Sequence, residues 1–136
     1  MKIKPKRLEK GDKIGIVSPA SPSYNKSDIE RGVKTFHEWG FNVELSKNLN
    51  KKTGFCSGSD IERAEDLNEM FKRKDIDAIF VTQGGYGSAQ ILRYLDFEAI
   101  RENPKIFIGF SDITSIHLAI NRIADVITFH GPGMTR

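Results

Sequence analysis

A serine stands where an apolar run of the sequence turns directly into an amphipathic stretch. Residues 105–110 are almost entirely apolar, Gly109 lies two positions before Ser111, and a helical pattern follows at once. This order is typical of a nucleophile elbow, in which a sharp strand-to-helix turn raises a serine hydroxyl above a sheet. The amide of Asp112, at the positive end of the following helix dipole, would be the first donor to an oxyanion. Ser111 is therefore the candidate nucleophile.

A glycine-rich loop at residues 83–87 strengthens this interpretation. It follows another apolar run, so we expect it at the end of an adjacent strand, where a glycine backbone can supply a second oxyanion donor. Gly84 and Tyr86 are candidates for lining a substrate cleft there, although packing alone would equally explain the tyrosine. The glycines do not follow the dinucleotide-binding pattern, and no phosphate-binding lysine follows them.

The elbow pattern is incomplete, so a simpler interpretation stays open. The second glycine of the usual G-x-S-x-G pattern is missing, because position 113 is Ile. Serine is also a preferred helix N-cap, and Ser111 could do no more than begin the helix. The pattern alone does not decide between a nucleophile and a cap.

A serine nucleophile also needs a base, and the histidines of this chain are poor candidates. His37 falls near the carboxyl end of the first predicted helix, away from the strand ends. His117 follows Ser111 at a distance of about 9 Å along the helix axis and on a different side of the helix. His130 follows the next strand and could approach the site, either as a base or as a contact that stabilises the turn. We expect the chain to supply only part of a catalytic centre.

Short apolar runs alternate with helical stretches along the whole chain. Strands are predicted at residues 13–17, 41–45, 77–82, 105–110 and 126–129. Helices are predicted from capping boxes at Ser27–Glu30 and Ser59–Glu62, at residues 88–95 and 111–123, and as one further turn at 96–102. This alternation predicts an α/β fold, Rossmann-like or flavodoxin-like, with a mainly parallel sheet of about five strands and helices on both faces. Loops at residues 18–22, 83–87 and 109–112 would gather at its carboxyl edge, where ligands bind in such sheets.

The composition is that of one globular domain. The chain has 136 residues, a net charge of +3 and 38% hydrophobic side chains, and one domain typically has roughly 100–200 residues. Basic residues cluster before the first strand, but no nucleic-acid motif accompanies them, so we expect a solvated edge and no nucleic-acid partner. Neither a membrane-spanning run nor a signal peptide is recognisable, and the single Cys56 cannot form an internal disulfide. We therefore expect a cytoplasmic protein with no membrane partner, and nothing in the sequence suggests a metal or a cofactor.

Several motifs occur in one order along the sequence. They are Ile16-x-Ser18-Pro19-Ala20, Gly58-Ser59-Asp60-x-x-Arg63-Ala64, Gly84-Gly85-Tyr86-Gly87-Ser88, Leu92-x-x-Leu95-Asp96, Asn103-Pro104-Lys105, Ile108-Gly109-Phe110-Ser111-Asp112-Ile113-Thr114 and Thr128-Phe129-His130-Gly131-Pro132. In this set and order, which covers essentially the whole chain, the sequence resembles the amino-terminal half of the LD-carboxypeptidase family of serine peptidases.

The resemblance implies a Ser–Glu–His triad with Ser111 as nucleophile and with the Gly85 and Asp112 amides as oxyanion donors. It also implies that residues 1–136 form the nucleophile-bearing domain, whose partner is a carboxy-terminal domain that holds the glutamate and the histidine and is absent from this chain. Family members remove the terminal D-alanine from murein tetrapeptides in cytoplasmic cell-wall recycling, and relatives hydrolyse a microcin antibiotic. The motifs are closer to those of the murein-cleaving branch of the family. One position differs, because Gln83 stands where an arginine is frequent in that branch. A homodimer is possible.

A non-catalytic binding module of flavodoxin or receiver type would share this order of elements. A receiver would need acidic residues after its first and third strands, where Ser18 and Thr82 stand. A flavodoxin would need a phosphate loop after the first strand, and two prolines at positions 19 and 22 remove amide donors from that loop. The residues therefore favour the peptidase.

Overall fold

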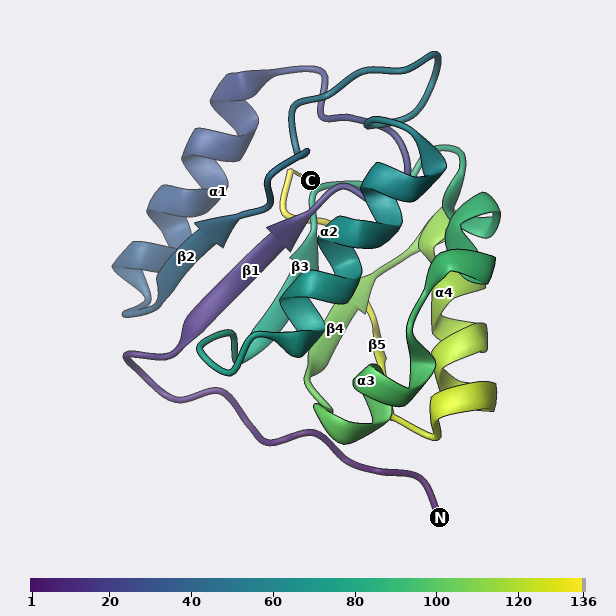
Figure 1. Ribbon diagram of the computed structural model, residues 1–136. Helices are drawn as coiled ribbons and strands as arrows, with labels where there is room; N and C mark the ends of the chain where they lie inside the picture. Colours follow the sequence, from purple (N-terminus) through teal and green to yellow (C-terminus); the bar gives the residue numbers. More distant parts are fainter. Residues whose placement is uncertain (136) are drawn as a thin grey trace.

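The computed structural model describes residues 1–135 and contains one parallel sheet (Figure 1). Its strands are β1 (Lys13–Val17), β2 (Asn42–Leu45), β3 (Ala78–Val81), β4 (Ile106–Gly109) and β5 (Phe129–His130). They lie in the order β2-β1-β3-β4-β5, and each neighbouring pair is parallel. The predicted α/β class with a five-stranded parallel sheet is confirmed.

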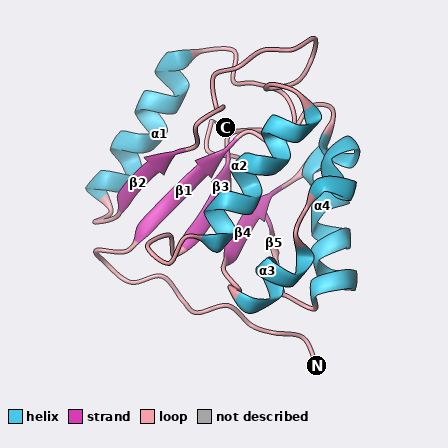
Figure 2. Cartoon of the chain, viewed as in Figure 1, coloured by secondary structure: helices cyan, strands magenta, loops and turns pink. Residues whose placement is uncertain are grey.

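Helices connect the strands and cover both faces of the sheet (Figure 2). They are the α-helices α1 (Lys26–Glu38), α2 (Asp60–Lys72), α3 (Phe97–Glu102) and α4 (Thr114–Ala119), the 3₁₀ helices η1 (Ser88–Tyr94) and η2 (Ser111–Ile113), and the π-helical turn η3 (Ile120–Ala124). Successive side chains of a strand point to opposite faces, so the sheet separates two cores. Ile14 and Ile16 pack with Phe36 of α1 on one face. Ile79 and Phe107 pack with α2, α3 and α4 on the other.

The two predicted capping boxes have different outcomes. The box at Ser59 is confirmed, because the Glu62 amide donates to Ser59 Oγ over 3.1 Å and the Ser59 amide donates to the Glu62 carboxylate over 3.0 Å. The box predicted at Ser27 is wrong, because α1 already begins at the preceding residue, with Asn25 as its N-cap. The Asn25 carbonyl accepts from the Asp28 amide over 3.1 Å. Ser27 therefore lies inside the first turn and cannot cap it.

Further element boundaries differ from those predicted. The strand predicted at residues 126–129 is displaced to β5, because Val126 pairs with Ile3 in an isolated parallel bridge. Residues 111–123 do not form one α-helix but pass from η2 through α4 into η3. At the start of this segment, the left-handed backbone of Ser111 is incompatible with an α-helix. Residues 88–94 form a 3₁₀ helix instead of the expected α-helix.

The basic amino-terminal segment runs along the edge of the sheet at which the strands begin (Figure 1). The Ile3 amide donates to the Asp125 carbonyl over 2.6 Å, and the Ile127 amide donates to the Ile3 carbonyl over 2.9 Å. Lys2 pairs with the Asp125 carboxylate at 3.1 Å. The segment therefore lies opposite to the carboxyl edge that the predicted site occupies. Within residues 1–135, none of the helices combines the length and the apolar character that crossing a membrane requires.

Candidate active site at the carboxyl edge of the sheet

Ser111 follows β4 in a strained turn. Its φ of +62° lies in the left-handed region, which costs a residue with a side chain roughly 1–3 kcal/mol. Phe110 before it is extended, and η2 begins at Ser111 itself, so the chain reverses within one residue. A Cβ on Gly109 would lie 2.8 Å from a methyl group of Val81 and 2.7 Å from one of Ile113. Glycine at position 109 therefore lets the turn close, and the Ser111 residue is left exposed at the carboxyl edge.

The glycine-rich loop lies directly against this turn. A Cβ on Gly84 would lie 3.2 Å from Cβ of Ser111. Gly84, Gly85 and Ser111 line one cavity of about 300 Å³, together with Tyr24, Gln83 and Phe110. Within residues 1–135 the Gly85 amide donates no hydrogen bond, and the Asp112 amide lies in the first turn of η2, where amides have no partner inside the helix. An oxyanion role for these two amides stays a prediction.

The loop after β1 holds the glycine-rich loop from the other side. The Ser21 amide donates to the Gly84 carbonyl over 3.2 Å. The Tyr86 amide in turn donates to the Ser21 hydroxyl oxygen over 3.0 Å, and the Gln83 side chain donates to the Pro22 carbonyl over 2.7 Å. The loops that were predicted to gather at the carboxyl edge therefore do meet there.

A buried serine joins the glycine-rich loop to the elbow. The Ser88 amide donates to the Asp112 carboxylate over 2.8 Å, and the Ser88 hydroxyl donates to the Asp112 carbonyl. The same hydroxyl lies 2.5 Å from Ser115 Oγ. The Asp112 carboxylate thus orients the loop, while its backbone amide remains the group that could face an oxyanion. Ser88 belongs to the glycine-rich motif of the sequence, but nothing near it in the chain signals a partner 24 positions away.

The histidines form no hydrogen bond with Ser111 within residues 1–135. His117 is buried, and its Nε2 lies 2.7 Å from the Gly109 carbonyl oxygen. A carbonyl only accepts, so we assign the hydrogen to Nε2, and Nδ1 accepts from the Thr128 hydroxyl over 2.8 Å. Burial lowers the pKa of His117 and so favours this neutral form. His117 therefore anchors the end of β4, and His130 is exposed on β5.

Two aromatic side chains, Tyr24 and Phe110, line the cavity that holds Ser111. Tyr86 is 57% exposed, its hydroxyl accepts from Gln90 over 3.1 Å, and it does not line the cavity that holds Ser111. Tyr24 could not be found from the sequence, because it precedes α1 in a loop with no recognisable motif. A cleft role for Tyr86 stays a prediction.

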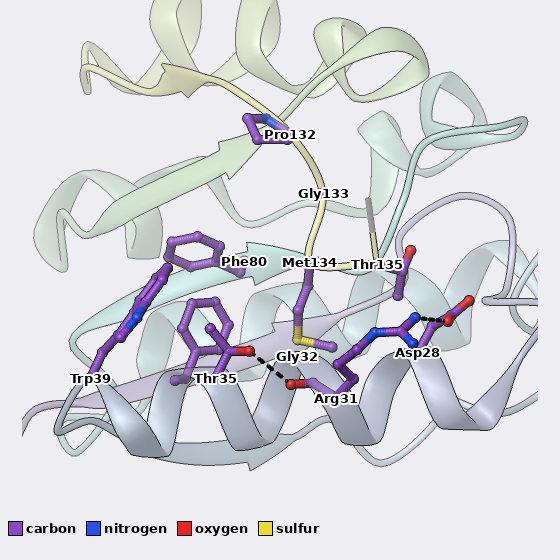
Figure 3. A pocket seen from close by; sticks show the side chains of 11 residues that line it. Asp28, Arg31, Gly32, Thr35, Trp39, Phe80, Pro132, Gly133, Met134 and Thr135 are labelled. Carbon is purple, nitrogen blue, oxygen red and sulfur yellow. Dashed lines mark hydrogen bonds and ion pairs between the residues drawn. The ribbon is translucent and has the colours of Figure 1, made fainter.

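A larger cavity of about 470 Å³ lies elsewhere, between α1 and residues 132–135 (Figure 3). The chain leaves β5 and crosses toward α1, where the Met134 side chain fills the space that a Cβ on Gly32 would need. The Met134 amide donates to the Val81 carbonyl over 2.9 Å and holds this crossing against β3. Trp39 and Phe80 line the cavity with Met134. None of the predicted site residues lies there, so the candidate chemistry belongs to the smaller cavity.

Comparison with known proteins shows the family to which the chain belongs. Residues 14–131 match the family described as the LD-carboxypeptidase N-terminal domain. The chain belongs to the LD-carboxypeptidase family. The family membership expected from the motifs is thereby confirmed.

Relatives of this chain are considerably longer. The chain is 42% identical over 132 residues to the probable murein peptide carboxypeptidase of Bacillus subtilis (strain 168), covering 97% of this chain and 41% of that protein. It is 38% identical over 129 residues to the microcin C7 self-immunity protein MccF of Escherichia coli, covering 93% and 38%. The crystal structure of an MccF-like protein from Bacillus anthracis matches with a TM-score of 0.94 at 38% identity, over 98% of this chain and 41% of that one. The chain thus spans about two fifths of the length of these relatives.

Proposed function

We propose that the complete protein is a serine peptidase that removes the terminal D-alanine from murein tetrapeptides, with Ser111 as its nucleophile. The observation that carries this proposal is the left-handed Ser111 in a cavity shared with Gly84 and Gly85. Strained residues of this kind cluster at active sites, where the surrounding structure holds them. The Bacillus subtilis relative is named a probable murein peptide carboxypeptidase, and a 29% identical relative from Pseudomonas aeruginosa is named murein tetrapeptide carboxypeptidase. We also place the reaction in the cytoplasm, as the resemblance to the family implies.

In the proposed reaction, Ser111 Oγ attacks the carbonyl carbon of the L,D bond before the terminal D-alanine, and a general base takes the hydroxyl proton. The tetrahedral oxyanion accepts hydrogen bonds from the Gly85 and Asp112 amides, and loss of one such donor typically costs about 10²–10³ in rate. The carbon–nitrogen bond then breaks, the amine of D-alanine takes up the proton, and the peptide stays on Ser111 as an ester. Water hydrolyses the ester and restores the hydroxyl.

We infer that the base comes from outside residues 1–135. His117 already bonds with both ring nitrogens, one to Gly109 and one to Thr128, and has no nitrogen left for Ser111. The relatives are more than twice as long as the chain. The glutamate and histidine of the implied triad would therefore lie in the part of the protein that corresponds to the remaining length of these relatives. That part would pack over the Ser111 cavity.

A second candidate substrate is an aminoacyl nucleotide of the microcin type. The Escherichia coli relative is named for microcin C7 self-immunity, and an MccF structure in complex with glutamyl sulfamoyl guanosine matches the chain with a TM-score of 0.93 at 36% identity. Gln83 lines the Ser111 cavity, and its side-chain amide donates a hydrogen bond to the Pro22 carbonyl. A neutral amide holds a substrate carboxylate less strongly than the arginine frequent in the murein branch. This observation favours the second substrate.

The test compares both substrates with the complete gene product that contains these residues. D-Alanine release from purified murein tetrapeptide is measured beside cleavage of glutamyl sulfamoyl guanosine. Release of D-alanine that disappears in Ser111→Ala supports the proposal, and cleavage of the nucleoside compound alone selects the second candidate. Undiminished turnover by a folded Ser111→Ala variant would reject Ser111 as the nucleophile under either candidate.

A further inference from the structure

A buried arginine outside the Ser111 cavity binds the backbone of several loops at once. Arg63 belongs to α2 and is 2% exposed. Its Nη1 donates to the Pro19 carbonyl over 2.8 Å and to the Gly87 carbonyl over 2.7 Å. Its Nε donates to the Gly58 carbonyl over 3.3 Å, and its Nη2 bonds to the Asp60 carboxylate over 2.5 Å. The guanidinium therefore joins the loop after β1, the loop before α2 and the glycine-rich loop.

Burial of the Arg63 guanidinium costs free energy, which its particular set of hydrogen bonds must offset. A buried cation loses its hydration, and it persists only when hydrogen bonds and an opposite charge replace the water. The Asp60 carboxylate supplies that charge. The Asp60 side chain is 40% exposed, whereas the Arg63 side chain taken alone is 1% exposed. A Cβ on Gly87 would lie 2.9 Å from Nη1, so the absence of a side chain at position 87 lets the guanidinium reach the carbonyl. Arginine fits this position because its planar fork can donate in several directions at once, whereas a lysine offers one point charge.

Two of the three loops that Arg63 joins, the loop after β1 and the glycine-rich loop, shape the Ser111 cavity. From Pro19 the chain continues to Ser21, which bonds to both Gly84 and Tyr86. From Gly87 it continues to Ser88, which bonds to Asp112 next to the nucleophile. The backbone around Gly85 thus lies between two attachments to one guanidinium. Movement of either attachment would shift the Gly85 amide relative to Ser111.

We propose that Arg63 is a positioning residue for the reaction at Ser111: it holds the glycine-rich loop so that the Gly85 amide stays directed at the oxyanion. The proposal rests on the proposed function, since it assigns Arg63 to that reaction. The hydrogen bonds of Arg63 go to Gly58, Pro19, Gly87 and Asp60, and Arg63 does not line the Ser111 cavity. Its effect is on the rate of the chemical step, because a displaced oxyanion donor weakens the transition state more than the bound substrate.

A matched control for Arg63 is available within the chain. Lys105 is another buried cation, 7% exposed, whose Nζ donates to the carbonyls of Met70 and Arg73. It precedes β4, so it lies at the opposite edge of the sheet from Ser111. Replacing Lys105 with methionine removes a buried cation and its backbone bonds without touching the three loops.

The first measurement is amide hydrogen exchange in the chain itself, with Arg63→Met, Arg63→Lys and Lys105→Met. We expect exchange in residues 83–88 to speed up by on the order of tenfold in both Arg63 variants while β1 and β3 stay protected, and to stay unchanged in Lys105→Met. If residues 83–88 exchange at the wild-type rate in the Arg63 variants, the proposal is overturned. If Arg63→Met does not fold, Arg63→Lys carries this measurement, because it keeps the charge and loses only the fork.

The second measurement is the rate of the complete gene product on whichever substrate it cleaves. We expect kcat to fall about 10²-fold in Arg63→Lys, as for other small displacements of catalytic groups, with KM changed less than about threefold. Lys105→Met should keep kcat when each variant is assayed at the same interval below its own melting temperature. An equal loss of kcat in both variants, or a rise in KM alone, overturns the positioning role. An inactive wild type would count against the proposed function, while the exchange measurement would still decide whether Arg63 holds the loop.

Discussion

Gly85 passes so close to Ser21 that the place of a Cβ atom on Gly85 is already occupied by the Ser21 hydroxyl. The same hydroxyl accepts the Tyr86 amide over 3.0 Å, so it cannot move aside without loss of a hydrogen bond. Gly85 also has a φ of +105°, which residues with a side chain rarely adopt. Space and backbone conformation both require glycine at the position that the proposed reaction uses as an oxyanion donor.

Gly85→Ala should therefore lower both rate and stability. In the complete protein we expect kcat to fall by about 10²–10³, the usual cost of one lost oxyanion donor. Gly11→Ala is the matched control, since Gly11 has a similar φ of +94° and a Cβ there would meet no atom within 4 Å. Urea unfolding should show a larger loss for Gly85→Ala than for Gly11→Ala, and equal losses would mean that the Ser21 contact contributes nothing.

Substitution of Ser111 should separate activity from stability. Ser111→Ala and Ser111→Gly should both abolish turnover, because each removes the nucleophilic oxygen. Ser111→Gly should nevertheless unfold at a higher urea concentration than Ser111→Ala, with a free energy of unfolding larger by about 1 kcal/mol. Glycine removes the left-handed strain at φ +62°, and the greater conformational entropy of its unfolded chain offsets part of that gain. An alanine variant as stable as the glycine variant would show that the elbow is not strained.

Residues 1–136 alone should fold but release no D-alanine. A serine hydroxyl is a poor nucleophile at neutral pH without a base, and loss of triad members typically costs on the order of 10⁴–10⁶ in turnover. The chain is incubated with murein tetrapeptide alone and then with the remaining part of the protein added as a separate polypeptide. Recovery on addition supports a base outside the chain. Turnover by the chain alone that is lost in Ser111→Ala would place a base inside it, and His130→Ala would then be the first variant to measure.

Lys105 should make the stability of the fold rise with pH in the alkaline range. Burial lowers the pKa of its ammonium from 10.5 to about 8, so between those values the unfolded chain binds more protons than the native one. Stability then rises with pH, with a slope that approaches about 1.4 kcal/mol per pH unit in the middle of the window. The difference in unfolding free energy between wild type and Lys105→Met, measured in urea from pH 7 to 10.5, isolates this slope. A difference that does not change with pH would contradict the lowered pKa.

Features that depend on neighbours along the chain could be predicted from the sequence alone. The capping box at Ser59 closes between residues three apart, and the alternation of apolar runs and helical stretches defines a parallel sheet wherever the chain folds. The elbow is also local, because Gly109 and Ser111 belong to the same turn. One local prediction was wrong: Asn25, in extended backbone at the end of the preceding loop, is the N-cap of α1 in place of Ser27.

Only the tertiary structure decided which atoms shape the site. The bond from the Tyr86 amide to Ser21 joins residues 65 positions apart, and the bond from Arg63 to Pro19 joins residues 44 positions apart. Such contacts exist because a parallel sheet collects the carboxyl ends of distant strands at one edge, where their loops must satisfy one another's buried polar groups. Spacing along the chain carries no information about those partners. The sequence therefore determined that Ser111 stands at a strand end, and packing between distant loops determined what surrounds it.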